Sequence, residues 1–354
     1  MHRSSRQERA HEPAHRERHE GERDADATAR SISFVLIPST IRLTMCGIVG
    51  YLDTSRGSRP IGTTLLAMLT ALDRRVPDSA GVAVWGEGVD GFTVRVALPD
   101  GDELAAHGTR VVRRARELAR VSGVVAHGPL LTFDIGKVDA HELVAALERD
   151  GAAEVVSLGH RLAIVKQVGA PRNLDTEFGI GKLAGSHGLG HTRLSTESRV
   201  DLSHSQPFWA HGTPDLAVVH NGHITNYHRL RRRYEQDGVR FYTENDSEVI
   251  GVYLGRKLAA GATLHEAMRD SVRELDGSFS YLAATGDTFG FAKDPYCLKP
   301  LIVAETPDAV AIANEEIALH AVLGNGYRAR EAGAAEVATW TTPPARGRQK
   351  RRAA

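Results

Sequence analysis

The sequence is short of cysteine, of long apolar runs and of any excess of charge. Its 354 residues contain two cysteines, so no disulfide framework is expected, although a single bridge between Cys46 and Cys297 is an alternative. Lys plus Arg equals Asp plus Glu at 44 each, which gives no reason to expect nucleic acid or an anionic membrane surface as a partner. No run is long enough to cross a bilayer, and the short apolar run at 32–38 follows a long mixed-charge segment, unlike a signal peptide. We therefore expect a cytoplasmic protein.

The chain is long enough, at 354 residues, for one large domain or two ordinary ones, and its 42% of hydrophobic residues allows a sizeable core. Residues 1–30 are dominated by Arg, Glu, His and Asp and cannot bury enough surface to offset the entropy of ordering. We interpret 1–44 as a disordered extension. An upstream start codon is the favoured origin, and a removable propeptide or a genuine tail are the alternatives. We expect a domain over 46–335 and a solvated basic tail over 336–354.

Hydrophobic spacing predicts the elements of that domain. The segment 46–52 is typical of a buried strand, 63–75 of a helix and 81–85 of a second strand. Residues 92–182 are interpreted as an inserted α/β lobe, with helices near 102–120 and 139–150 and strands near 123–133 and 154–168. Thr263 and Glu266 form a capping-box pattern at a helix start. Antiparallel strands are expected at 279–285, 288–292 and 300–303.

Residues 45–50 read Met-Cys-Gly-Ile-Val-Gly, an initiator-like Met followed by a small nucleophile. If Met45 is the true start and is removed, Cys46 carries both a thiol, of pKa about 8.5, and a free α-amine, of pKa about 7.7–8.0. One residue then supplies a nucleophile and a base for its proton near neutral pH. In the printed chain other residues precede Cys46, so this chemistry depends on where translation or processing begins.

Four further clusters hold polar residues at predicted turns and strand ends. They are Arg-Arg-Val-Pro-Asp-Ser-Ala-Gly at 74–81, Gly-His-Thr-Arg-Leu-Ser-Thr-Glu at 190–197, Val-Val-His-Asn-Gly-His-Ile-Thr-Asn at 218–226 and Thr-Glu-Asn-Asp-Ser-Glu-Val at 243–249. Each has a purely structural alternative. Pro77-Asp78 is turn chemistry, Asn221-Gly222 is a strong hairpin signal, and 245–247 could simply cap a helix.

Taken together and in this order, the Cys-Gly-Ile start, Thr-Arg-x-x-Thr, His-Asn-Gly and Asp-Ser-Glu resemble the class II glutamine amidotransferases. The resemblance covers residues 46 to about 324. It implies an α+β fold, the four-layer αββα sandwich of antiparallel sheets found in N-terminal-nucleophile hydrolases, here with the inserted lobe. It also implies hydrolysis of L-glutamine to glutamate and ammonia.

The same resemblance implies roles for the catalytic residues. Cys46 would attack the side-chain amide of glutamine and form a thioester. The side chain of Asn221 and the backbone N–H of Gly222 would form the oxyanion hole, where one donor is typically worth about 2.7–4 kcal/mol in the transition state.

The substrate-binding residues follow in the same way. Arg193 would hold the α-carboxylate of glutamine through a fork that Lys cannot reproduce, Asp246 would bind its α-ammonium, and Thr196 would add a contact. Arg75 is a further substrate-binding candidate, although Val76 replaces the glycine usual in the family. A metal site built from the histidines of these motifs is not favoured, because no ligand spacing supports it.

The insert and the segment Lys-Asp-Pro-Tyr-Cys-Leu-Lys-Pro at 293–300 resemble the stand-alone amidotransferase subunits of glutamate-synthase-like enzymes, with the N-methylglutamate synthase subunit as the nearest example. That likeness implies a separate synthase partner carrying flavin, an iron–sulfur cluster as a second expectation there, and no cofactor on this chain. Two alternatives stay open: the same nucleophile acting on another amide, and a catalytically silent regulatory or scaffold subunit in which the Cys46 amine is blocked.

Overall fold

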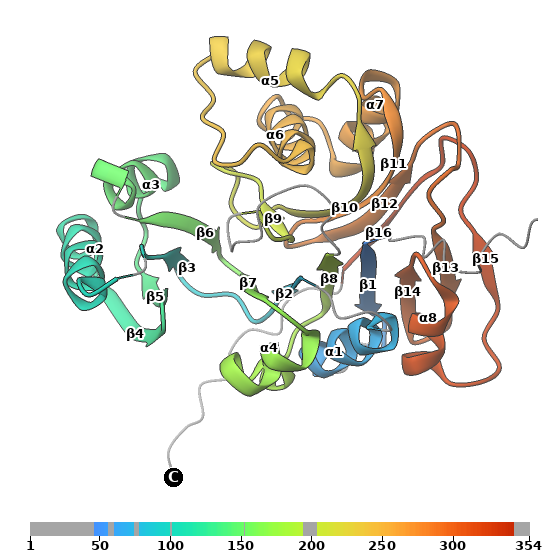
Figure 1. Ribbon diagram of the computed structural model, residues 1–354, viewed down its shortest axis with the longest axis horizontal. Coiled ribbons are helices and arrows are strands. Elements are labelled where there is room, and N and C mark those ends of the chain that lie inside the picture. The colour runs from blue at the N-terminus through green and yellow to red at the C-terminus, as the bar shows by residue number, and fades with distance from the viewer. Residues whose placement is uncertain are drawn as a thin grey trace, which may run out of the picture. The chain divides into compact units, whose positions relative to one another are not determined.

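Two antiparallel sheets form the centre of the structure, a computed structural model that describes residues 46–55, 60–73, 78–99, 101–151, 153–193 and 204–342 (Figure 1). The seven-stranded sheet has the order β15 (Ala329–Glu331), β13 (Ile302–Glu305), β14 (Ala309–Ala313), β1 (Gly47–Asp53), β8 (His187–Arg193), β2 (Ser79–Trp85) and β7 (Leu162–Val168). The five-stranded sheet has the order β16 (Val337–Thr341), β12 (Thr288–Lys293), β11 (Gly277–Ala284), β10 (Ala217–Ile224) and β9 (Phe208–Trp209).

Helices cover the outer face of each sheet, which gives four layers (Figure 1). The seven-stranded sheet is covered by α1 (Ile61–Leu72), α4 (Pro171–Phe178) and α8 (Glu316–Leu323). The five-stranded sheet is covered by α5 (Tyr227–Gln236), α6 (Asp246–Ala259) and α7 (Leu264–Glu274). This is the αββα arrangement that the sequence led us to expect.

Alternation along β1 explains the layering, because successive side chains of a strand point to opposite faces. Ile48 and Leu52 enter the core between the sheets, whereas Val49 and Tyr51 face the helices. Gly50 lies so close to the other sheet that an added Cβ would meet side-chain atoms of that sheet at 2.8–3.0 Å. The sandwich therefore has little room for larger residues at this point.

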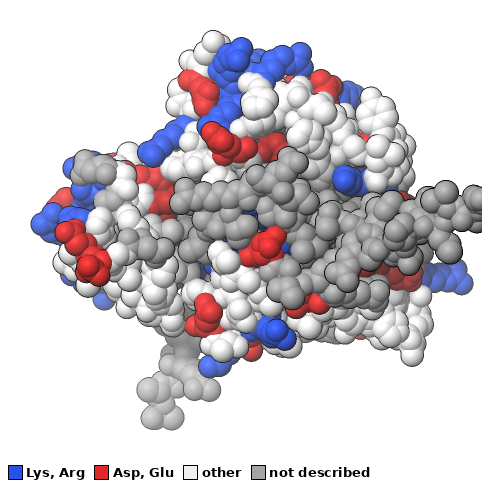
Figure 2. Space-filling model, viewed as in Figure 1, with Lys and Arg blue, Asp and Glu red and all other residues white. Residues whose placement is uncertain are grey.

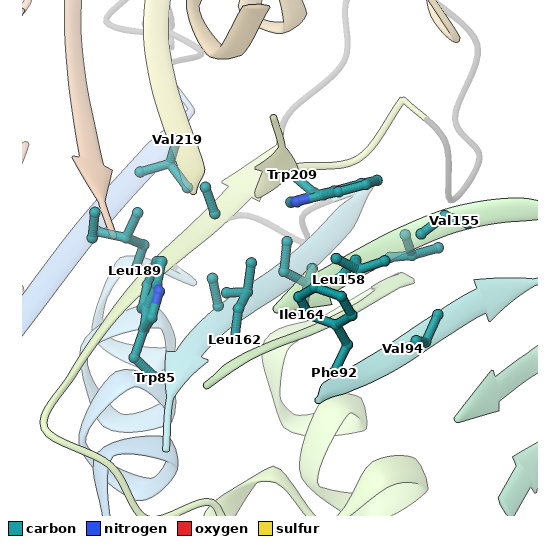
Figure 3. Packing of buried hydrophobic residues seen from close by; sticks show 14 of the residues in the cluster. Trp85, Phe92, Val94, Val155, Leu158, Leu162, Ile164, Leu189, Trp209 and Val219 are labelled. Atoms are coloured by element: carbon teal, nitrogen blue, oxygen red, sulfur yellow. The ribbon is translucent and has the colours of Figure 1, made fainter. Parts of the chain in front are cut away.

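A third sheet lies beside the sandwich, and we call residues 92–159 the insert lobe. Its strands have the order β4 (Val121–His127), β5 (Leu130–Ile135), β3 (Phe92–Ala97) and β6 (Glu154–Gly159), and its helices are α2 (Leu104–Leu118) and α3 (Ala140–Leu147). The apolar core runs without a break from the sandwich into this lobe (Figure 3). The remainder of the expected insert, 162–182, differs in placement, because β7 joins the seven-stranded sheet and α4 packs near it.

Three details of the expected elements change. The strand expected at 123–133 is a hairpin of β4 and β5 that turns at Gly128, which has a φ of 54°. The strand expected at 154–168 is also two strands, β6 and β7, and the Asp215 carboxylate accepts three successive backbone N–H groups from the turn between them. The basic tail expected from 336 begins later, because β16 pairs with β12 and Trp340 packs beside Phe289 and Phe291.

Other local predictions are confirmed. Thr263 and Glu266 form the capping box at the start of α7, and β11 and β12 are antiparallel neighbours. None of the helices in the described ranges is both long and apolar enough to span a membrane. Figure 2 shows acidic and basic side chains interspersed on one face, with Lys and Arg gathered over α5.

Candidate active site

The candidate site lies at the end of the sandwich where β1 begins. Gly47 pairs with the penultimate residue of β8, which brings Cys46 and Arg193 to the same end of neighbouring strands. At the other end of β8, His187 Nε2 lies 2.8 Å from the carbonyl oxygen of Thr285, just after β11. The first residue of β8 therefore lies beside the end of β11, and the last residues of β8 lie toward the beginning of β11. Because β10 and β11 are antiparallel, the end of β10 lies on that same side.

Strand alternation places the candidate residues on the face between the two sheets. They share the parity of core residues on their own strands: Cys46 with Ile48, Arg193 with Leu189, and Asn221 with Val219. Three motifs that are far apart in the sequence thus meet in one corner of the sandwich.

Asn221 and Gly222 lie inside β10, where they pair with Ser280 and Phe279 of β11. The hairpin alternative for Asn221-Gly222 is therefore wrong. Asn221 is 4% exposed, and its Nδ2 is buried without a hydrogen-bond partner among the described residues. A buried donor without a partner costs roughly 1–3 kcal/mol, so a polar group that fills this position would be stabilised.

Gly222 has a φ of 138°, and an added Cβ would lie 2.2 Å from the carbonyl oxygen of Ser278. The opposite residue, Phe279, bonds through both its N–H and its carbonyl to Asp294, on the far side of β11. In an antiparallel ladder this makes Gly222 and Phe279 a non-hydrogen-bonded pair, so the Gly222 N–H points away from β11.

The N–H groups of His220 and Ile224, two residues before and two residues after Gly222, point to the same side of β10, and each donates a hydrogen bond to a side chain. The His220 N–H donates to Gln206 Oε1 at 2.6 Å, and the Ile224 N–H donates to Asp246 Oδ2 at 2.7 Å. The described residues supply no side-chain acceptor for the Gly222 N–H between them. The amide of Asn221 and this N–H are thus adjacent donors at one place on β10.

Arg193, the last residue of β8, is 8% exposed. Its Nη1 donates to the carbonyl oxygen of His204 at 3.0 Å. A buried guanidinium at the end of this strand, beside Cys46, fits a role in binding an anionic group.

Asp246 is the first residue of α6, and Asn245 caps this helix by accepting the Ser247 N–H at 3.0 Å. The capping alternative is therefore correct for Asn245, while the Asp246 side chain points toward the end of β10. There its carboxylate lies 3.7 Å from His220 Nδ1 and 3.6 Å from the exposed His223.

Two buried imidazoles underlie the site. Burial, with a smaller contribution from Arg193, lowers the pKa of His191 to about 3, and burial also lowers the pKa of His220, against the effect of Asp246. Both rings are therefore neutral near pH 7. His220 Nδ1 lies 2.8 Å from Ser247 Oγ. Across the described ranges, no three His, Cys, Asp or Glu side chains are grouped in a way that could hold a metal ion.

Asn314 is a residue of this corner that the sequence analysis missed. It follows β14, accepts the Ile48 N–H at 2.9 Å through Oδ1, and donates through Nδ2 to the Cys46 carbonyl at 3.3 Å. It therefore fixes the backbone on which the nucleophile candidate sits. No motif marks it, and the only sequence signal is a polar residue ending an otherwise apolar strand.

The remaining candidates have separate outcomes. Arg75, Val76, Thr196 and residues 1–44 lie outside the described residues. No disulfide joins Cys46 and Cys297, so the disulfide alternative is wrong. Cys297 is partly exposed and has a φ of 57°.

Comparison with known proteins agrees with this geometry. Residues 191–321 match the glutamine amidotransferase domain family. The chain is 36% identical over 279 residues to the glutamine amidotransferase-like protein GlxB of Rhizobium meliloti, covering 78% of this chain and 91% of that protein. It is 33% identical over 288 residues to a putative glutamine amidotransferase of Methanothermobacter thermautotrophicus, covering 79% and 94%.

Two solved structures share the fold. They are the allosteric regulatory enzyme of purine biosynthesis and the glutamine phosphoribosylpyrophosphate amidotransferase of B. subtilis. Each has a TM-score of 0.53 and 20% identity, covering 82% and 84% of this chain but only 45% and 49% of their own. The fold is therefore that of the N-terminal-nucleophile amidotransferases. With the relatives above, the chain belongs to the class II glutamine amidotransferases.

Proposed function

We propose that this protein hydrolyses L-glutamine to glutamate and ammonia through a thioester on Cys46, and that it supplies the ammonia to a separate synthase subunit. The observation that carries the first part is the buried Asn221 Nδ2, which has no partner among the described residues and lies on the face it shares with Cys46 and Arg193. A donor held in this way is already oriented for an oxyanion, so no reorganisation is needed during the reaction.

The chemistry begins with the free α-amine of Cys46, which takes the thiol proton as the sulfur attacks the amide carbon of glutamine. The carbonyl oxygen becomes an oxyanion that accepts hydrogen bonds from Asn221 Nδ2 and the Gly222 N–H. The C–N bond then breaks, and the α-ammonium of Cys46 returns its proton to the leaving nitrogen, which departs as ammonia. Water attacks the resulting thioester, releases glutamate and restores the thiol.

Recognition of glutamine rests on two opposite charges. In this proposal the Arg193 guanidinium binds the α-carboxylate and Asp246 binds the α-ammonium, with Thr196 and Arg75 as further contacts. Together they discriminate against amides that lack either charged group, because such an amide loses a charge-assisted contact that L-glutamine makes. This argues against the alternative of a different amide substrate.

The second part of the proposal concerns the partner that receives the ammonia. The resemblance of the insert lobe and of residues 293–300 to glutamate-synthase-like subunits supports a partner of that kind. This partner would carry the flavin and any iron–sulfur cluster, and both subunits would act in the cytoplasm. The test is to add candidate synthase subunits and measure whether glutamine-dependent amination of their acceptor exceeds that with free ammonia at equal total nitrogen. Equal rates would remove the delivery step from the proposal.

The glutaminase proposal is tested with protein that begins at Cys46. L-Glutamine should release ammonia, whereas an amide of the same length without the α-carboxylate should give at most about 1% of that kcat/KM, because it cannot make the contact with Arg193 that L-glutamine would make. Equal turnover of both amides would contradict the assigned recognition. The silent-subunit alternative is favoured instead if native protein retains residues before Cys46 and a glutamine-like electrophile does not label that thiol.

A further inference from the structure

The insert lobe reaches the segment that leads into Asp246 through one buried carboxylate, that of Glu148. We propose that Glu148 is a positioning residue for glutamine: by holding Tyr242, it fixes residues 240–245 and thereby the place of Asp246 at the start of α6. This inference rests on the proposed function of Asp246. It adds a role for the insert lobe in substrate affinity.

Glu148 ends α3, and its side chain is 5% exposed. Oε1 accepts the Val155 N–H of β6 at 2.9 Å, which fixes the carboxylate within the insert lobe. Oε2 accepts the hydroxyl of Tyr242, and His211 Nε2 lies 3.3 Å from Oε1. The guanidinium of Arg240 lies 3.9 Å from Oε2. A single carboxylate thus joins the insert lobe to two separate segments of the amidotransferase sandwich.

The Tyr242 ring is contacted by two side chains, in addition to the bond at its hydroxyl. The His211 ring stacks on it with centroids 3.7 Å apart and planes 18° apart. The Arg240 guanidinium carbon lies 4.7 Å from the Tyr242 centroid. Stacking and cation–π contact of this kind restrict the ring to one orientation, so a shift of Glu148 relative to the sandwich is passed to the Tyr242 backbone.

A short row of hydrogen bonds continues from Tyr242 to the helix that carries Asp246. The N–H groups of Tyr242 and Thr243 donate to the two carboxylate oxygens of Glu248 at 2.8 and 2.9 Å. Thr243 Oγ1 accepts the Asn245 N–H at 3.1 Å, and Asn245 caps α6. Tyr242, Thr243 and Asn245 are therefore each tied to a neighbouring residue, and Asp246 directly follows Asn245.

The electrostatics support a fixed arrangement. Burial alone would raise the pKa of Glu148, but His211 and the Tyr242 hydroxyl hold it below its ordinary value. Burial and the bond to Glu148 raise the pKa of Tyr242. At neutral pH the pair is therefore a carboxylate accepting from a protonated phenol, a charge-assisted bond of the strong kind.

The test compares Tyr242→Phe and Glu148→Gln with the unchanged protein, all beginning at Cys46. We expect the KM for L-glutamine to rise about three- to tenfold, with kcat changed less than twofold. The rise is smaller than the loss of one charged hydrogen bond would give, because Tyr242 acts on the substrate only through Asp246. For 4-carbamoylbutanoate, which lacks the α-ammonium that Asp246 would bind, we expect less than a twofold change. A role in stability alone would move both substrates together.

The control is Glu142→Gln, the same change at an exposed position on α3, which should leave both KM values unchanged. On an Asp246→Asn background, Tyr242→Phe should add no further loss. An unchanged KM in Tyr242→Phe, or an equal rise for both substrates, would overturn the inference; if Glu148→Gln fails to fold, Tyr242→Phe alone decides. If the unchanged protein releases no ammonia, the proposed function has failed, and calorimetric binding of L-glutamine to the same variants still tests the positioning.

Discussion

Replacement of Asn221 by alanine should separate catalysis from stability. Because Asn221 Nδ2 has no hydrogen-bond partner in the described part of the chain, the substitution breaks no bond of that atom and relieves an unsatisfied buried donor worth roughly 1–3 kcal/mol. This gain in stability offsets much of the free-energy cost of the small cavity that the shorter side chain leaves. In the transition state the loss is one oxyanion donor, about 2.7–4 kcal/mol, so kcat for glutamine should fall about 100- to 1000-fold with little change in KM.

Asn226 provides the matched control, because it is also an asparagine near the end of β10 but its amide is satisfied. Its Nδ2 donates to the Glu274 carbonyl at 2.9 Å and its Oδ1 accepts the Asp276 N–H at 3.2 Å. Asn226→Ala should lower the free energy of unfolding by about 1 kcal/mol and leave kcat unchanged. Steady-state glutaminase kinetics and urea unfolding of both variants decide the matter. A kcat within tenfold of the unchanged protein for Asn221→Ala would refute the oxyanion role.

Three other predictions concern the candidate site and the stability of the sandwich. Gly222→Ala should lower the free energy of unfolding by at least about 2 kcal/mol, since φ is 138° and the new Cβ would overlap Ser278. Urea unfolding measures this loss. The control is Gly251→Ala in α6, which should not be destabilised because the atoms nearest to its new Cβ are 3.4 Å away. Arg193→Lys should raise the KM for glutamine at least about tenfold by losing the fork, and an unchanged KM in steady-state assays would reject the carboxylate role. His187, whose pKa burial lowers to about 3, is neutral when folded but binds a proton when unfolded below pH about 6.5. Stability should therefore fall as pH drops from about 6.5 toward 3, by about 1.4 kcal/mol per pH unit for each such histidine, and His187→Gln should flatten the slope by that amount.

Local pattern was sufficient where a segment's own residues decide its structure. The apolar run after Cys46 is β1, and the Thr263 capping box starts α7. The Cys46 start and the later motifs could be linked only through their resemblance to a family. No local rule says that the beginnings of β1 and α6 lie at the same corner as the ends of β8 and β10. The structure supplies that reason through strand register.

Local rules failed where a distant contact outweighed them. Asn221-Gly222 carries a hairpin signal but lies within a strand, because Gly222 is needed where the backbone of Ser278 approaches closely. Asn314 and Glu148 were invisible in the sequence, since their partners Ile48 and Tyr242 are 266 and 94 residues away. Buried polar pairs of this kind leave no periodic trace along the chain.

One comparison decides whether Cys46 acts through its own free amine. Glutamate release from L-glutamine is measured for the chain that begins at Cys46 and for the same chain with Met45 retained. We expect turnover by the first, and at most about 1% of that rate by the second, because the general base is lost. Equal rates from the two chains, or no release by the chain beginning at Cys46 with or without a synthase partner, would contradict it.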